Sequence, residues 1–279
     1  MRHERVSDAI FVFTSEMYAQ VTASAVVTTE GIVVVDTLPF PQETRAMVSF
    51  LKGLGRGPIR YLVNTHWHGD HTNGNAVFAN VQLVSHQLCA ETMQAMGEAR
   101  QDESTAERPT REEGIQIRVP DITFDEGEMC LHLGGKSLQM IPTPGHTPDS
   151  IVVNVREDKV VLAADTLMPL PYFVKGSHQD FKNSLRSLLE LPADTVVQGH
   201  GEVLLRGEIK EVISSHICYL DTIQRRVAAL LEAGQGPEAL RKMDIESCGK
   251  SRIPLNGLVQ DLHHANLQAL YQEMTKTND

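Results

Sequence analysis

The feature that most constrains this chain is the segment THWHGDH at residues 65–71. It places three imidazoles and one carboxylate within six positions, at His66, His68, Asp70 and His71. Imidazole nitrogen and carboxylate oxygen are ligands that suit zinc and its first-row neighbours, and one ion needs three or four of them. Four such side chains in so short a segment can therefore contribute to two metal sites.

The residues before this segment, 59–64 (IRYLVN), are typical of a buried strand, so the segment is expected in the loop at the strand's C-terminal end. Side chains two positions apart in an extended loop point the same way, so His66 and His68 can share one ion. Asp70 and His71, where the chain turns into a predicted helix, would then face a second ion. The alternative is a polar loop whose histidines satisfy backbone groups.

Three further candidate ligands each follow a predicted strand: His146, Asp165 and His200. In layered α/β proteins, sites gather at one edge of a sheet, outside the strand ends. We therefore expect these side chains to join the histidines of residues 65–71. Asp36, which ends the run IVVVD, is either a structural carboxylate near this site or a turn residue.

The pattern of predicted elements indicates an α/β protein. Runs of β-branched residues alternate with amphipathic segments, and the pair Gly134-Gly135 between two apolar runs predicts a β-hairpin. From about residue 208 to the end, the sequence is typical of helices. We favour a single domain over residues 1–279, with residues 208–279 as a helical C-terminal segment.

Residues 97–114 (GEARQDESTAERPTREEG) differ from the rest of the chain, because they are dense in charge and almost without large apolar side chains. Such a segment is too polar for a core. We expect a solvated insertion, with a lid or a partner-contact segment as the alternative.

The net charge of the chain limits the classes of partner that we expect. Thirty-six acidic and 25 basic residues give a net charge of -11, which repels phosphate backbones and anionic membrane surfaces. We expect a small-molecule substrate, no nucleic acid and no membrane; a homo-oligomer stays open. An N-terminus without a signal-peptide pattern, and four cysteines without a CxxC pair, indicate a cytoplasmic protein.

Taken together, the motifs resemble those of the metallo-β-lactamase superfamily: HxHxDH at residues 66–71, GHT at 145–147, an aspartate after a hydrophobic strand in AADTL, and GH at 199–200. The resemblance implies a four-layer αβ/βα sandwich, in which two β-sheets lie face to face with helices outside. By matching positions, it implies that His66, His68 and His146 hold one metal ion, that Asp70, His71 and His200 hold another, and that Asp165 bridges them.

Asp165 stands where the class B1 and B2 β-lactamases carry a cysteine, so the chain looks more like the glyoxalase II and lactonase branch. That branch implies a zinc hydrolase with two Zn²⁺ per chain, or alternatively Fe²⁺ or Mn²⁺. A metal-bridging hydroxide would attack the carbonyl of a small ester, lactone, thioester or amide. Asp70 would orient the water and pass on a proton.

Two other functions stay open. A mononuclear iron enzyme similar to the persulfide dioxygenases would share the first histidines and Asp165. A metal-binding protein without enzyme activity could contact a partner through residues 97–114. Beyond the ligands, Tyr172 and His178 follow Asp165 and are candidate substrate contacts; a tyrosine of the core or surface and an ordinary polar histidine are the alternatives.

Overall fold

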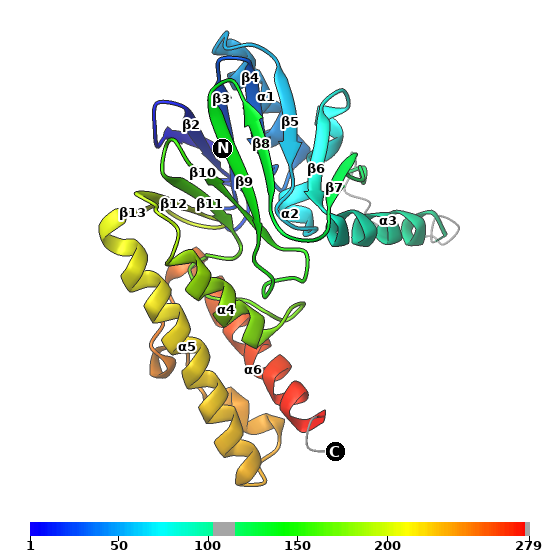
Figure 1. Ribbon diagram of the computed structural model, residues 1–279. Helices are drawn as coiled ribbons and strands as arrows, with labels where there is room; N and C mark the ends of the chain where they lie inside the picture. The colour runs from blue at the N-terminus through cyan, green and yellow to red at the C-terminus, as the bar shows by residue number, and fades with distance from the viewer. Residues whose placement is uncertain (103–114, 277–279) are drawn as a thin grey trace.

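Two β-sheets lie face to face in the computed structural model, which describes residues 1–102 and 115–276 (Figure 1). Within these residues, the first sheet follows sequence order: β1 (Arg2–Arg5), β2 (Ile10–Thr14), β3 (Thr22–Thr28), β4 (Gly31–Val35), β5 (Ile59–Val63), β6 (Gln82–His86) and β7 (Ile122–Phe124). β1 to β4 pair antiparallel, whereas β4 to β7 pair parallel.

The second sheet has the order β13-β12-β11-β10-β9-β8 within the described residues. Its strands are β8 (Met129–Leu133), β9 (Lys136–Pro142), β10 (Ile151–Val155), β11 (Val160–Ala164), β12 (Thr195–Gln198) and β13 (Leu204–Leu205). Only β11 and β12 of these pair parallel. Gly134 and Gly135 join β8 to β9 at φ of 48° and 82°, a left-handed backbone that glycine adopts without a Cβ penalty. The predicted hairpin is therefore confirmed.

Helices cover the outer face of each sheet (Figure 1). The helices of the described residues are α1 (Pro41–Gly53), α2 (Gly69–Thr72), α3 (Gln87–Asp102), α4 (His178–Leu188), α5 (Arg206–Glu232) and α6 (Leu258–Lys276), with 3₁₀ turns η1 (Asn75–Phe78), η3 (Pro237–Lys242), η4 (Glu246–Cys248) and η5 (Pro254–Gly257). α4, α5 and α6 form the helical C-terminal layer beside the second sheet. The expected αβ/βα arrangement with a helical C-terminal segment is thus confirmed.

The alternation of strand residues explains the four layers. In β4, Ile32 and Val34 pack with Met47 and Leu51 of α1, whereas Val33 packs against the second sheet. Side chains of successive strand residues point to opposite faces of the sheet. A strand made of apolar residues therefore contributes to two cores, one between the two sheets and one between the first sheet and α1. A third core joins the outer face of the second sheet to α4, α5 and α6.

One expectation changes in detail. The polar segment expected as a solvated insertion begins inside a helix, because α3 runs to Asp102 and residues 97–102 are therefore helical. Residues 103–114, the rest of that segment, lie outside the described residues.

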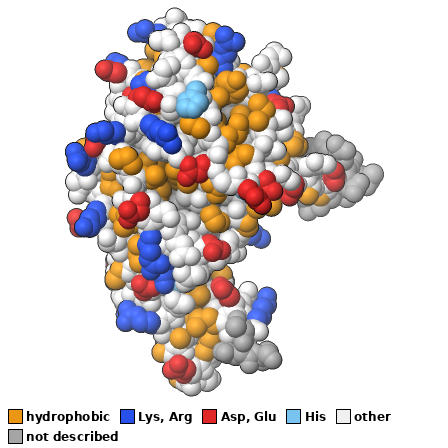
Figure 2. Space-filling view, viewed as in Figure 1, with side chains coloured by type: hydrophobic (Ala, Val, Ile, Leu, Met, Phe, Trp, Pro, Cys, Tyr) orange, Lys and Arg blue, Asp and Glu red, His pale blue; other side chains and the backbone are white. Residues whose placement is uncertain are grey.

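No helix among the described residues is long and apolar enough to cross a bilayer. Acidic and basic side chains are interspersed over the face seen in Figure 2.

Candidate metal centre

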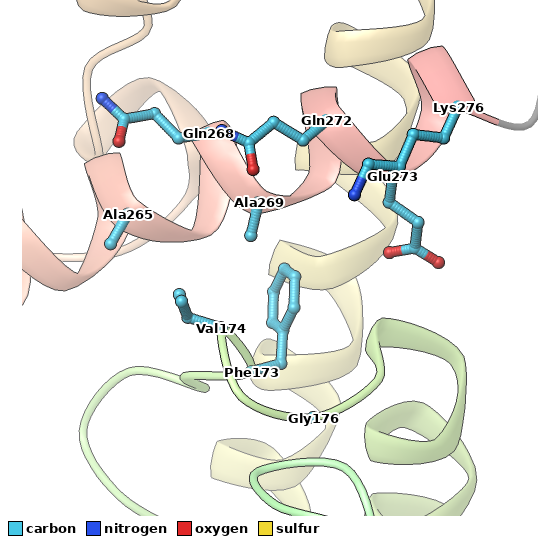
Figure 3. Close-up of a pocket in the computed structure, with 9 residues that line it drawn as sticks. All are labelled: Phe173, Val174, Gly176, Ala265, Gln268, Ala269, Gln272, Glu273 and Lys276. Carbon is cyan, nitrogen blue, oxygen red and sulfur yellow. The ribbon is translucent and has the colours of Figure 1, made fainter.

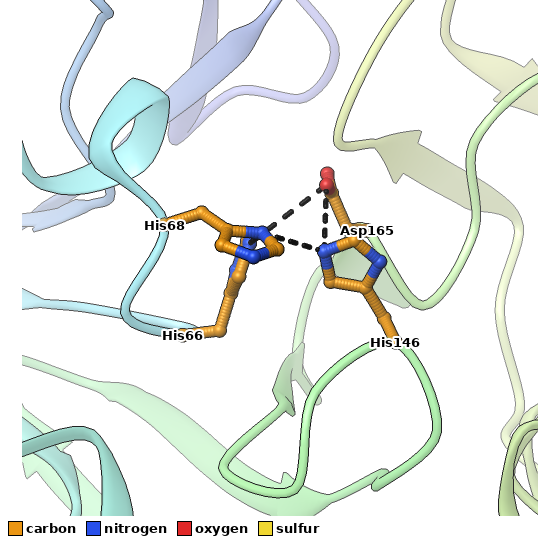
Figure 4. Close-up of side chains that lie close together, drawn as sticks. All are labelled: His66, His68, His146 and Asp165. Atoms are coloured by element: carbon orange, nitrogen blue, oxygen red, sulfur yellow. Dashed lines mark hydrogen bonds and ion pairs between the residues drawn. The ribbon is translucent and has the colours of Figure 1, made fainter. Parts of the chain in front are cut away.

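The seven candidate ligands lie together at one edge of the paired sheets, in two groups. β5 leads into residues 66–71, while β9, β11 and β12 lead to His146, Asp165 and His200. One ligand loop thus comes from the first sheet and three from the second. Figure 4 shows His66 and His68 approaching from one side, and His146 and Asp165 from the other.

Backbone hydrogen bonds tie these loops across the two sheets. Ile151 N–H donates to Thr65 O at 2.9 Å, and Thr22 N–H donates to Gly199 O at 2.8 Å. The Thr22 hydroxyl also donates to Gln198 O at 2.5 Å. The relative position of the ligand loops is therefore fixed by main-chain contacts, not by the ligands alone.

The first group contains His66, His68, His146 and Asp165. His68 Nδ1 lies 3.1 Å from His66 Nε2 and 2.8 Å from His146 Nε2. Asp165 Oδ2 lies 3.2 Å from His146 Nε2 and 3.7 Å from His66 Nε2. All are buried except His68, which is half-buried. Three imidazole nitrogens and one carboxylate oxygen therefore face a common point.

The second group contains Asp70, His71 and His200. His71 Nε2 lies 3.2 Å and His200 Nε2 3.4 Å from Asp165 Oδ1, and Asp70 Oδ2 lies 3.6 Å from His200 Nε2. The two oxygens of Asp165 thus face different groups, Oδ2 the first and Oδ1 the second. This is the geometry of a carboxylate that can bridge two ions.

Backbone carbonyls fix the tautomers of two histidines. His146 Nδ1 lies 2.7 Å from Tyr172 O, and His200 Nδ1 lies 2.9 Å from Ala19 O. A carbonyl oxygen only accepts hydrogen bonds, so each Nδ1 carries a proton, and in the neutral ring each Nε2 keeps its lone pair. In both rings this lone pair points into the cluster, as metal ligation requires.

Asp36 fixes the tautomers of two more histidines, one directly and one through Thr65. Its Oδ1 accepts from Thr65 N–H at 2.8 Å, and its Oδ2 accepts from the Thr65 hydroxyl at 2.7 Å and from His71 Nδ1–H at 3.1 Å. Because the Thr65 hydroxyl donates its hydrogen bond to Asp36, its oxygen is left to accept a hydrogen bond from His66 Nδ1–H at 3.0 Å. Asp36 is therefore a structural carboxylate beside the site, the first of the two roles considered for it.

Burial and charge set the protonation of the cluster. Burial lowers the pKa of His66 well below its usual value and that of His68 to about 4. Burial also lowers the pKa of His71, but the carboxylates, chiefly Asp165, outweigh it and the net shift is well upward. Burial raises the pKa of Asp165, but the histidines, chiefly His200, outweigh it and hold that pKa well below its usual value. At neutral pH an ionised Asp165 thus faces neutral imidazoles in the first group.

The donor set fits divalent metal ions. Ligands about 2.05 Å from a tetrahedral ion lie about 3.3 Å apart, and the contacts of the first group range from 2.8 to 3.7 Å. In the second group, His71 Nε2 and Asp165 Oδ1 are buried without a hydrogen-bond partner. A cation between these atoms would satisfy both of them.

The two candidate substrate contacts have different surroundings. Tyr172 is half-buried beside the centre, with its ring centroid 5.9 Å from that of His146, and burial raises the pKa of its phenol. His178 is 2% exposed and its Nε2 donates to Leu220 O of α5 at 3.0 Å. The interpretation of His178 as a substrate contact is therefore wrong for this structure, because the start of α4 turns its ring into the helical core.

One residue near the centre escaped the sequence analysis. Tyr18, in the loop between β2 and β3, is 48% exposed, and burial, Asp70 and Asp165 together raise the pKa of its phenol. Its neighbour Ala19 provides the carbonyl that orients His200. No spacing or residue type marks this loop, because its contribution is one exposed ring and one backbone oxygen.

A groove of about 600 Å³ lies between residues 173–176 and α6. Phe173 and Val174 point toward the helix, along which Gln268 and Gln272 lie (Figure 3). The loop that lines this groove begins beside Tyr172, whose carbonyl holds His146. The same short loop therefore borders the metal centre and the groove.

Comparisons with known proteins give a family match and a similar fold. The sequence model of the metallo-beta-lactamase superfamily matches residues 18–200. A beta-lactamase-like protein 2 homolog of Caenorhabditis elegans is 23% identical over 188 residues, 67% of this chain and 56% of the relative. A hydroxyacylglutathione hydrolase of Methylococcus capsulatus is 29% identical over 189 residues, 66% of this chain and 60% of the relative.

The chain thus matches less than two thirds of the length of these two relatives. Among solved structures, a metallo-beta-lactamase from Pontibacter korlensis aligns with a TM-score of 0.61 at 21% identity. The alignment covers 76% of this chain and 97% of that structure. At this identity the likeness concerns the fold.

Gly199 allows a direct test of the cluster. A Cβ on this residue would overlap Asp165 Oδ1 and the backbone of Ala164 and Asp165. Gly199→Ala should therefore displace the Asp165 carboxylate and lower the metal content per chain, measured by inductively coupled plasma mass spectrometry. Gly207→Ala, whose Cβ meets open space, is the control. Equal metal content in the two variants would contradict the assignment.

Proposed function

The chain belongs to the metallo-β-lactamase superfamily, and on that premise we propose that it is a dinuclear zinc hydrolase that cleaves a small ester, lactone, thioester or amide. One observation carries the proposal: Asp165 directs Oδ1 and Oδ2 to separate groups of histidines. A carboxylate shared in this way suits two ions, whereas a mononuclear iron centre would use only one of its oxygens.

The proposed ligands are those that the motifs imply. His66, His68 and His146 would hold the first ion, Asp70, His71 and His200 the second, and Asp165 would bridge them. When bound, two divalent ions lower the pKa of water toward neutrality and polarise a carbonyl oxygen. The supporting observations are the convergent atoms and the inward lone pairs that Asp36, Tyr172 and Ala19 impose.

Asp70 and Tyr172 would act on the substrate side of the centre. The Asp70 side chain is 23% exposed and lies at the outer side of the second group, so it can orient water and accept a proton. The phenol of Tyr172 is protonated at neutral pH, burial raises its pKa further above the usual value, and it could donate a hydrogen bond to a developing oxyanion.

One relative indicates the substrate class that we favour. The relative named hydroxyacylglutathione hydrolase favours a thioester, yet this chain matches 60% of that protein. A small-molecule substrate and a cytoplasmic location stay predictions, as do the absence of nucleic-acid and membrane partners and the choice between monomer and homo-oligomer.

Metal analysis combined with a hydrolysis screen tests the function. About two zinc ions per chain and turnover of a thioester, lactone, ester or amide would support it. One iron per chain with oxygen consumption on a thiol-derived substrate would overturn it in favour of the dioxygenase. Metal binding with no turnover in either assay would favour a binding protein.

Asp165→Ala should lose both ions and all activity, because one carboxylate serves both groups. Metal content measured by mass spectrometry and by titration with a chromogenic chelator checks this. Asp194→Ala removes a carboxylate that is 44% exposed and lies outside the cluster, and it should keep wild-type metal content. An Asp165→Ala protein with two tightly bound ions would refute the bridging role.

Asp70→Asn should separate binding from catalysis. The amide keeps the shape of the side chain but loses its charge and its ability to accept a proton, so turnover should fall by about 10²- to 10⁴-fold. The first group does not include Asp70 and should keep its ion, visible as about one zinc per chain or more. Near-normal turnover would exclude this role for Asp70.

A further inference from the structure

Asn266 of α6 contacts the loop beside the metal centre with both ends of its amide. Its Nδ2 donates to Pro171 O at 2.6 Å, and its Oδ1 accepts from Phe173 N–H at 3.2 Å. The side chain is completely buried. The two contacts fall on either side of Tyr172, so the amide fixes the peptide units that flank this residue.

Tyr172 is the residue whose carbonyl orients His146. His146 Nδ1 donates to Tyr172 O at 2.7 Å, while His146 Nε2 points to Asp165 Oδ2 at 3.2 Å. A short chain of contacts therefore leads from Asn266 through the Tyr172 backbone to the ring of a proposed metal ligand. Rotation of the peptide at Tyr172 would turn that ring away from the first group.

A buried polar network holds Asn266 in place. The Tyr219 hydroxyl lies 3.4 Å from Asn266 Nδ2 and 2.9 Å from His263 Nδ1, and His263 Nε2 donates to Met243 O at 2.9 Å. Asn266, Tyr219 and His263 are all at most 1% exposed. A buried amide whose partners are all supplied has one rotamer available, so it can act as a rigid support.

The C-terminal end of the same loop, at residues 176–177, is held by contacts to Gly145. Ser177 N–H donates to Gly145 O at 3.0 Å, and a Cβ at Gly176 would overlap the carbonyl of Gly145. These contacts hold the end of the loop against the segment that carries His146, but they leave residues 171–173 to another support. Asn266 provides that support from the C-terminal helical segment.

We propose that Asn266 is a positioning residue for the metal centre, which orients His146 through the backbone of Tyr172. The helical C-terminal segment thereby takes part in metal affinity although it contains none of the proposed ligands. The inference depends on metal binding by the proposed groups and is independent of which bond the enzyme cleaves. Loss of a partner that orients a ligand typically costs 10- to 100-fold in metal affinity.

Asn266→Ala removes both contacts to the loop. We expect zinc affinity, measured by chelator competition, to fall on the order of tenfold, at the low end of that range because Asn266 acts through one intermediate. In the metal-free protein, hydrogen exchange of the Phe173 amide should accelerate by at least about tenfold, because its acceptor is gone. This second readout requires neither metal nor activity.

Leu267→Ala is the matched control. Leu267 is the next residue of α6 and is fully buried in the core, so its truncation lowers the melting temperature without removing a hydrogen bond to the loop. Zinc affinity and Phe173 exchange should stay near wild type at temperatures where the protein is folded. An equal loss of affinity in Leu267→Ala would mean that general destabilisation explains the effect, and would overturn the proposal.

Asn266→Asp tests the mechanism and serves if the alanine variant fails to fold. It keeps an acceptor for Phe173 N–H but loses the donor to Pro171 O, so protection of the Phe173 amide should persist while zinc affinity falls less than in Asn266→Ala. Wild-type zinc affinity in every Asn266 variant that folds would refute the positioning role. A wild-type protein that binds no zinc would instead refute the proposed metal centre.

Discussion

The structure depends on a buried carboxylate, Asp165, that faces imidazole nitrogens from two directions. A carboxylate taken out of water without compensation costs several kcal/mol, and burial lowers the pKa of His66, His68 and His146, so these neutral rings carry no charge to offset that cost. Divalent cations held between these atoms, as in the proposed centre, would make the same arrangement favourable.

The backbone around the cluster is strained at residues that orient or carry its side chains. Among the described residues, Ala19, Asp36 and Ala164 have φ of 44°, 60° and 43°, in the left-handed region that non-glycine residues seldom adopt. Ala19 orients His200, Asp36 orients His71, and Ala164 immediately precedes Asp165. Each such residue costs about 1–3 kcal/mol. The sheets and the contacts between them over-determine these positions, so the strain persists where it shapes the site.

The clustering of the seven side chains could be predicted from the sequence, because candidate ligands that follow strand ends must meet at one edge of a layered α/β fold. The partners that orient the ligands could not. Tyr172 O and Ala19 O are backbone atoms, which every residue type offers equally. The prediction for His178 failed for a related reason. His178 follows Asp165 closely enough in sequence to suggest a substrate contact, but the direction of its ring depends on how α4 packs against α5.

The helical C-terminal segment lies outside the region that the family match covers, yet it contributes residues near the proposed metal centre. The family match ends at residue 200, before α5 begins at Arg206. Yet α6 reaches the loop of residues 171–173 through Asn266 and forms one wall of the groove on the other side of that loop. All seven proposed ligands lie within the matched region, whereas the residues around the proposed centre come partly from outside it. The family match alone therefore does not define all the residues that surround the proposed centre.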